Sequence, residues 1–111
     1  MFVIPCKYTS KSPILDCVRS IRKYYPNDLI VVVDSDSDDK SYFDLVKEYN
    51  VVIEDISNKN FLDGALWYCF NKYDQEEFFY LIHDSMKIKM NFDYVEESDF
   101  TCISSFPNTC W

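Results

Sequence analysis

LIVVVD at residues 29–34 places five consecutive aliphatic residues directly before a carboxylate, and this stretch decides the fold. A strand with one face in water alternates apolar and polar side chains. An unbroken, mostly β-branched run instead predicts a strand covered on both faces, as in a parallel sheet. The run ends abruptly at Asp34, because residues 34–40 are wholly polar. We therefore expect a buried strand that leads into a polar loop.

Three more apolar runs alternate with three helical patterns around this strand. Strands are predicted at residues 2–5, 29–33, 51–53 and 78–82, helices at 12–25, 41–49 and 60–73, and a further candidate strand at 100–106 after a connecting loop at 90–99. Such alternation favours right-handed crossovers and a mostly parallel sheet. The expected fold class is α/β, a three-layer Rossmann-like domain with helices on both faces of the sheet. We expect residues 1–111 to form a single domain, because the chain is too short for two cores.

Each predicted helix begins at a residue suited to N-capping. These residues are Ser12 before Pro13, Ser41 with Asp44 in a capping-box pattern, and Asn60 with Asp63. The stripes expected to be buried are Ile14, Leu15, Val18 and Ile21 in the first helix, and Leu62, Ala65, Leu66, Cys69, Phe70 and Tyr73 in the third. The single glycine, Gly64, costs about 1 kcal/mol relative to Ala inside a helix. It is either tolerated there or marks a close approach of the backbone to a ligand.

Composition and charge narrow the function classes. With 48% hydrophobic residues the chain can bury a core without disulfides or a structural metal. A formal charge of -8 repels a phosphate polymer, so nucleic acid is not an expected partner. A small anionic ligand is still compatible with this charge if a divalent cation bridges it to carboxylates.

The cysteines and the lack of long apolar runs indicate the cellular compartment in which the protein is expected. No run approaches the length that spans a bilayer, and the N-terminus does not resemble a signal peptide, so we expect a cytoplasmic protein. Five cysteines without a CxxC pair predict reduced thiols, with Cys17 and Cys69 in the core. Cys6 is a candidate reactive thiol, although an inert one is the commoner case.

Polar residues gather where the predicted strands end. In parallel sheets ligands bind beyond the carboxyl ends of the strands. Four carboxylates follow the strand at 29–33, namely Asp34, Asp36, Asp38 and Asp39, and they form either a cation-binding loop or a solvated loop with capping roles. Asp34 is nearest the strand end and least free to point away from the sheet. His83 and Asp84 follow the strand at 78–82; the histidine is either structural or functional, whereas a carboxylate there suits a hard cation.

The order of these segments is similar to that of a known family. Phe2-Val3-Ile4-Pro5, then a helix ending near Tyr24-Tyr25-Pro26, then residues 29–39 resemble the opening of GT-A glycosyltransferases of the large inverting family. Asn60 with the helix after it, and residues 79–85, resemble that family's Asn-Gly-helix stretch and its DxD strand. The resemblance covers residues 2 to about 88. It implies a GT-A nucleotide-sugar-binding domain.

The resemblance also implies a set of site residues. Pro5 and Tyr8 would line a base pocket, Asp34 would contact the base, and the loop at Asn60 would lie near the sugar and phosphates. The implied nucleotide-sugar-binding set is Pro5, Tyr8, Asp34, Asp36, Asn60, Gly64 and His83, and the implied metal set is Asp84 and Ser85, which would hold Mn²⁺ or Mg²⁺ against the diphosphate. No catalytic residue is implied.

Two functions follow as hypotheses. The first is a domain that binds a nucleotide-diphosphate sugar with a divalent metal and transfers the sugar to a glycan or another acceptor. The second is a catalytically inactive module that acts through protein partners, a homo-oligomer among them, because the DxD positions read His83, Asp84 and Ser85 and only a short segment follows them. An exposed aromatic patch at Tyr42, Tyr94, Phe106 or Trp111 would favour the second.

Overall fold

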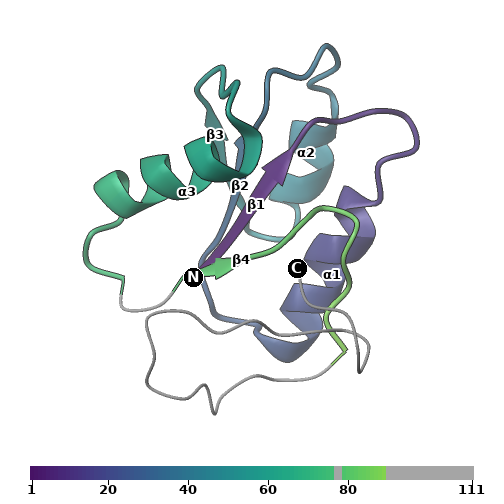
Figure 1. Cartoon of the computed structure of the whole chain (residues 1–111). Coiled ribbons are helices and arrows are strands. Elements are labelled where there is room, and N and C mark those ends of the chain that lie inside the picture. The colour runs from purple at the N-terminus through teal and green to yellow at the C-terminus, as the bar shows by residue number, and fades with distance from the viewer. Residues whose placement is uncertain (77–78, 90–111) are drawn as a thin grey trace, which may run out of the picture.

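A computed structural model gives the fold and describes residues 1–76 and 79–89 (Figure 1). The candidate strand at 100–106 and the loop at 90–99 lie outside the described residues, as does the start of the predicted strand at 78–82. None of the helices within the described ranges has the length and apolar character needed to cross a membrane.

The sheet has four strands in the described part of the chain, and all of them are parallel. They are β1 (Phe2–Cys6), β2 (Ile30–Asp34), β3 (Val52–Asp55) and β4 (Tyr80–Leu81), in the spatial order β3-β2-β1-β4. The register pairs Phe2 with Ile30 and Cys6 with Asp34. All five residues of β1 and of β2 are buried, as the unalternating run at 29–33 predicts for a doubly covered strand.

Helices cover both faces of this sheet (Figure 1). They are α1 (Ile14–Tyr24), α2 (Tyr42–Lys47) and α3 (Phe61–Lys72). Phe2, Ile4 and Val32 pack with the buried residues of α1 and α2 in one cluster. Val3, Val31 and Val33 pack with Ala65 and Cys69 of α3 in the other. The predicted fold class, a three-layer α/β domain with helices on both faces of a parallel sheet, is confirmed.

The helix starts differ from the capping predictions. None of the N-cap residues, which are Pro13, Ser41 and Asn60, makes a side-chain capping hydrogen bond. The Ser12 hydroxyl donates to Asp84 Oδ2 instead, at 3.1 Å. Ser41 donates its own N–H to Asp39 Oδ1 at 2.9 Å, so the polar loop before α2 supplies the bond that a capping box would have made. The second helix also ends at Lys47, before the predicted Tyr49.

The stripe predicted for the third helix is wider than the face that is buried. Only Ala65 and Cys69 are fully buried, and Phe70 is 52% exposed although its ring contacts Phe79 at 4.5 Å between centroids. The reason is the layer arrangement: α3 is the single helix on its face within the described residues, so no neighbouring helix covers its flanks. Trp67, on the same helix, is 72% exposed.

Candidate functional site

The strand order creates a switch point between β1 and β4. From β1 the chain moves to β2 and then β3 on one side, and it crosses back to place β4 on the other side of β1. In open parallel sheets, ligands bind in the crevice at the carboxyl ends of the two strands where the order reverses. The segments at this switch point are the loop after β1 and residues 83–85 after β4 (Figure 1).

Pro5 lies at this switch point, within the central strand β1. In a parallel pair the N–H and C=O of one residue point to the same side. The Phe2 N–H donates toward β2, to Leu29 O, whereas Val3 O accepts from Ile82 N–H on the β4 side. Pro5 therefore faces the β4 side, where it has no N–H to donate. Pairing of β1 with β4 ends at Val3 and Leu81, which is the last residue of β4, so β1 continues to Cys6 without a β4 partner opposite it.

Asp84 lies at this opening, and its carboxylate contacts the first loop. Its Oδ2 accepts from Ser12 Oγ at 3.1 Å and lies 3.6 Å from Cys6 Sγ, and the residue is half-buried. The backbone of His83 is fixed in turn, because Cys17 Sγ lies 3.6 Å from His83 O. Ser85 is exposed. The side chain of Asp84 is thus held beside the crevice with one oxygen occupied.

The two thiols nearby are not activated. Burial first, and then the Asp84 charge, raises the pKa of Cys6 to about 12. The pKa of Cys17 rises to about 12 for the same reasons. A thiolate is the nucleophilic form of cysteine, so neither group is a nucleophile at neutral pH. The inert alternative for Cys6 is the one that this geometry favours.

Asp34 lies at the same edge of the sheet, one strand away, and is fully buried. Its Oδ1 accepts from the Tyr42 hydroxyl at 2.7 Å and its Oδ2 from the Ser37 N–H at 3.0 Å. The Ser37 hydroxyl then accepts from the Tyr8 N–H at 2.9 Å, and the Tyr8 ring stacks on Tyr42 at 4.7 Å. Asp34 therefore ties the loop after β2 to the loop after β1, as its place next to the strand suggested.

The other carboxylates of the acidic loop point to solvent. Asp36, Asp38 and Asp39 are exposed, and Asp36 has a left-handed φ of 59°. Hydrogen bonds from the Ser41 hydroxyl and N–H lower the pKa of Asp39. The acidic loop is therefore solvated in this structure: Asp36 is exposed, and Asp39 is exposed and accepts the Ser41 N–H at the start of α2.

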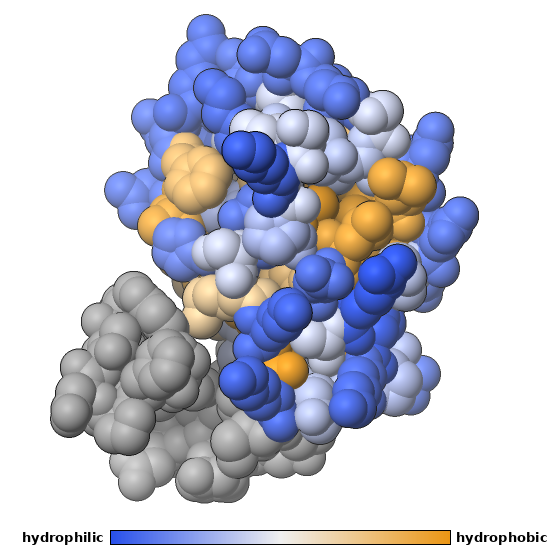
Figure 2. Space-filling model, turned by 90° about the vertical axis from the view of Figure 1, so that its right-hand side faces the viewer, coloured by the Kyte–Doolittle hydropathy of each residue, from blue (hydrophilic) through white to orange (hydrophobic). Residues whose placement is uncertain are grey.

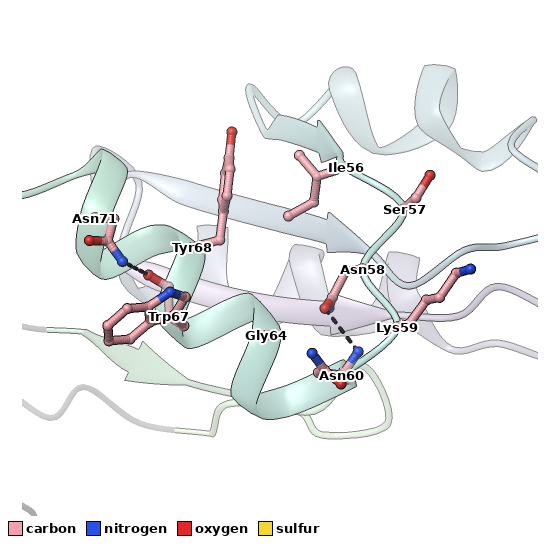
Figure 3. A pocket seen from close by; sticks show the side chains of 9 residues that line it. All are labelled: Ile56, Ser57, Asn58, Lys59, Asn60, Gly64, Trp67, Tyr68 and Asn71. Carbon is pink, nitrogen blue, oxygen red and sulfur yellow. Dashed lines mark hydrogen bonds between the residues drawn. The ribbon is translucent and has the colours of Figure 1, made fainter.

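Asn60 and Gly64 lie at a different place, an open pocket of about 480 Å³ beside α3 (Figure 3). Asn58 shapes the loop that leads to it. Its Oδ1 accepts from the Asn60 N–H at 3.2 Å, and its Nδ2 donates to Phe61 O at 2.9 Å. A Cβ on Gly64 would collide with Asn58 Oδ1, so the close approach that Gly64 allows is to this side chain.

The predicted site residues thus fall into three groups. The first group comprises Pro5 on β1, Tyr8 in the loop after β1, Asp34 at the end of β2 and Asp36 in the exposed loop after it. The second group, His83, Asp84 and Ser85, follows β4. Cys6 joins these two groups, because it pairs with Asp34 in register and contacts Asp84. Asn60 and Gly64 line the separate pocket. Among residues 1–76 and 79–89, no three His, Cys, Asp or Glu side chains form a group that could hold a metal ion.

Glu54 is a buried carboxylate that the sequence did not point to. It lies on β3, only 7% exposed, beneath α3. Its Oε1 accepts from Lys72 Nζ and from the Tyr73 hydroxyl, both at 2.6 Å, and its Oε2 accepts from the Tyr68 hydroxyl at 2.9 Å. One feature of the sequence could have indicated a buried acceptor. Tyr68, Lys72 and Tyr73 are spaced so that their three donors lie on one side at the C-terminal end of α3.

The aromatic surface suggested for a protein-binding module is not present at Tyr42. That side chain is fully buried against Asp34, while Tyr94, Phe106 and Trp111 lie outside the described residues. Figure 2 shows the side of the molecule where α1 and α2 lie, and there hydrophilic residues dominate around one apolar area to the right of the middle.

Comparison of the chain with known protein families, curated proteins and solved structures finds no match in any of the three. The function is therefore argued from the geometry of these groups.

Proposed function

We propose that the chain binds a nucleotide-diphosphate sugar, together with Mg²⁺ or Mn²⁺, at the crevice between β1 and β4, and transfers the sugar to an acceptor as a GT-A-like domain. The observation that carries the proposal is the place of Asp84. It stands at the end of β4, beside the opening that begins after Val3, with its carboxylate held by Ser12 and Cys6. Asp34 ends the neighbouring strand at the same edge of the sheet, which supports a shared binding region at the carboxyl ends of the strands.

The donor set fits a cation only when the diphosphate is bound with it. Mg²⁺ is commonly held by one or two carboxylates, with phosphate oxygens and water completing its octahedron. Asp84, with the hydroxyl of Ser85 next to it, offers such a minimal set, and a larger cluster is lacking among the described residues. A cation at this position would neutralise the charge that develops on the leaving diphosphate.

Asp34 acts in this proposal as a positioning residue. Both of its oxygens are occupied by Tyr42 and Ser37, and the residue is fully buried. It would set the shape of the loop against which a base lies, next to the half-buried Tyr8. Direct contact of Asp34 with a base stays a prediction of the family resemblance. His83 is half-buried with its ring 6.4 Å from that of Phe61 at the start of α3, and its contact with a nucleotide sugar stays a prediction of the family resemblance.

Titration calorimetry with UDP, GDP and their sugars tests the proposal, each with Mn²⁺, with Mg²⁺ and with EDTA. We expect metal-dependent binding of at least one nucleotide, and weak binding of the metal alone. Asp84→Asn keeps the volume of the side chain but removes the charge, and we expect it to weaken metal-dependent binding about tenfold or more.

Asp38→Asn is the matched control, because it removes an exposed carboxylate from the acidic loop without touching the crevice. It should bind as the parent chain does. Circular dichroism confirms that each variant is folded. The absence of binding across the whole panel by folded parent protein would overturn the proposal, and so would unchanged metal dependence in Asp84→Asn.

A further inference from the structure

The pocket beside α3 is separate from the crevice between β1 and β4. It is lined by residues of the loop after β3 and of the outer side of α3, namely Ile56, Ser57, Asn58, Lys59, Asn60, Gly64, Trp67, Tyr68 and Asn71. A smaller hollow formed by Asn60, Asp63, Gly64 and Trp67 adjoins it. Neither Asp34 nor Asp84 lines either space. Two lining residues, Asn60 and Gly64, belong to the nucleotide-sugar-binding set that the family resemblance implies, but neither acidic strand end takes part in this pocket.

Trp67 is the main apolar surface at this pocket. Its side chain is 72% exposed, more than any other large hydrophobic residue in the described ranges. Figure 3 shows the indole on α3, with Asn71 one turn further along the helix. Asn71 Nδ2 donates to Trp67 O at 2.8 Å, which fixes the amide beside the ring and leaves its Oδ1 available. An exposed indole next to an amide offers a flat apolar face with a polar edge.

The opposite wall carries polar groups that have no partner among residues 1–76 and 79–89. The Asn60 amide does not cap α3, and the hydroxyl of Ser57 and the ammonium of Lys59 form no hydrogen bond or ion pair with these residues. By contrast, Asn58 in the same loop bonds to Ser35, Asn60 and Phe61. Asn58 thus fixes the loop. In Figure 3 the side chains of Ser57 and Lys59 point away from α3, so Asn60 is the loop residue whose unpartnered amide lies at the helix.

The loop is also held in an uncommon backbone shape. Ser57 and Phe61 have left-handed φ values of 53° and 43°, at the two ends of the segment that carries these polar groups. Such conformations cost about 1–3 kcal/mol each for residues other than glycine. The wall of the pocket is therefore preorganised by Asn58, and its shape does not depend on a ligand.

We propose that this pocket binds a pyranose ring of a neutral saccharide, stacked on Trp67. A pyranose has an apolar C–H face that fits an indole, and a rim of hydroxyls that both donate and accept hydrogen bonds. Asn amides also do both, which suits hydroxyls better than a charged group. A polyanion is disfavoured, because Lys59 is the only cation that lines the pocket, Asp63 lies next to it, and the chain carries a charge of -8. This inference does not rest on nucleotide binding at the crevice.

Tryptophan fluorescence tests the inference directly, because the chain has only two tryptophans, Trp67 and Trp111. In Trp111→Phe, Trp67 is the only tryptophan that emits. We would titrate this protein, without metal or nucleotide, with glucose, galactose, N-acetylglucosamine and their disaccharides, and with uridine as a planar ring without a diphosphate. We expect a saturable blue shift with at least one saccharide and a dissociation constant on the order of 1 mM.

Variants then assign the binding to the pocket, with affinities measured by ligand-observed NMR in the parent chain. Trp67→Ala should abolish binding, and Asn71→Ala, which removes the amide beside the indole, should weaken it about five- to tenfold. Phe70→Ala is the matched control, because it removes an exposed aromatic ring of the same helix that does not line the pocket. It should bind as the parent does, with the fold of each variant checked by circular dichroism.

Three results would overturn the inference. They are the absence of any saturable response to the saccharides, undiminished binding by folded Trp67→Ala, and a response to uridine in place of the sugars. None of them bears on the metal-dependent calorimetry, so the two proposals fail independently.

Discussion

At the scale of single residues, buried carboxylates do most to position the loops and layers of this domain. Asp34 joins two loops at one edge of the sheet, and Glu54 joins β3 to the C-terminal half of α3. Burial alone would raise the pKa of Glu54, but hydrogen bonds from Lys72, Tyr73 and Tyr68 outweigh it and hold the pKa below its ordinary value of 4.5. The charged form of Glu54 is therefore the one that the fold stabilises.

Glu54→Gln should lower the free energy of unfolding at neutral pH by about 2 kcal/mol, because three donors lose a charged acceptor. The stabilisation is fully present above the unfolded pKa and disappears as the pH falls through the lowered pKa of the folded state. The difference between parent and variant should therefore shrink below about pH 4. Urea denaturation at a series of pH values measures it.

Glu48→Gln serves as the control for this pH series. Glu48 is exposed at the end of α2, and its carboxylate makes no hydrogen bond or ion pair with the described residues. Its variant should follow the parent at every pH. A stability difference for Glu54→Gln that stays constant with pH would contradict the role assigned to the charge.

The sequence predicted Asp34 better than Glu54, for a physical reason. Asp34 directly follows a run of five aliphatic residues that form a buried strand. The sequence therefore indicated that its side chain has little freedom to point away from the sheet. Glu54 lies within a short strand whose neighbours are partly exposed, and nothing in the local pattern distinguishes it from a solvated side chain. Its partners come from a helix fourteen to nineteen positions away, and only the tertiary structure brings them together.

At the scale of elements, Arg22 connects the ends of two helices. Its Nε donates to Tyr49 O at 2.7 Å and its Nη2 to Asn50 O at 2.9 Å, after the last turn of α2. Its Nη1 donates to Asp28 O at 2.6 Å and to Tyr25 O at 3.1 Å, between α1 and β2. Burial lowers the pKa of Arg22, although the five-donor guanidinium stays charged.

Replacing Arg22 should release both connections. We expect Arg22→Ala to lower the free energy of unfolding by about 2–3 kcal/mol, and Arg22→Lys to recover less than half of this, because one ammonium cannot reach carbonyls on two loops. Chemical denaturation measures both. Lys23→Ala removes an exposed cation of the same helix that lies over the neighbouring Tyr24 ring and does not reach the segment after α2, so it should leave the denaturation midpoint nearly unchanged. Equal effects at the two positions would refute the bridging role of Arg22.

The positions of the elements were predictable, whereas their ends were less so. Apolar spacing located α1 and α3, because a buried stripe is a local property of the sequence. Helix capping was predicted wrongly at Ser12, because a hydroxyl at a loop bonds to whichever carboxylate the fold brings near. Here that carboxylate is Asp84, 72 residues later in the chain.

At the scale of the whole molecule, the parallel sheet with a helix layer on each face could be predicted from the alternation of patterns. The pocket beside α3 could not, because it depends on how Asn58 turns the loop after β3. The exposure of Trp67 was equally hidden, since its position on the outer side of α3 follows from which helix is left without neighbours.

The two layers also bury the thiols of the described residues, which gives a global probe of stability. Cys6, Cys17 and Cys69 are buried, and burial raises the pKa of Cys69 to about 11. In a variant with Cys102→Ser and Cys110→Ser, we expect no reaction with a disulfide reagent at about pH 8 until the chain is unfolded. In denaturing urea all three thiols should react.

The rate of thiol modification, followed by absorbance at a series of urea concentrations below the unfolding transition, should rise in parallel with the opening of the fold. Rapid modification of one thiol in the native variant, located by mass spectrometry, would show that its layer opens locally and would contradict the expectation.

Pro5 also has a consequence for self-assembly. Within residues 1–76 and 79–89, β1 has no strand partner on the β4 side after Val3, and unpaired backbone of this kind is where another chain adds a strand. An incoming strand would find no donor at Pro5, so a continuous ladder cannot form along that side. Pro5 therefore disfavours the addition of a strand from another molecule at this edge of β1. A ligand that binds there has to be recognised by side chains.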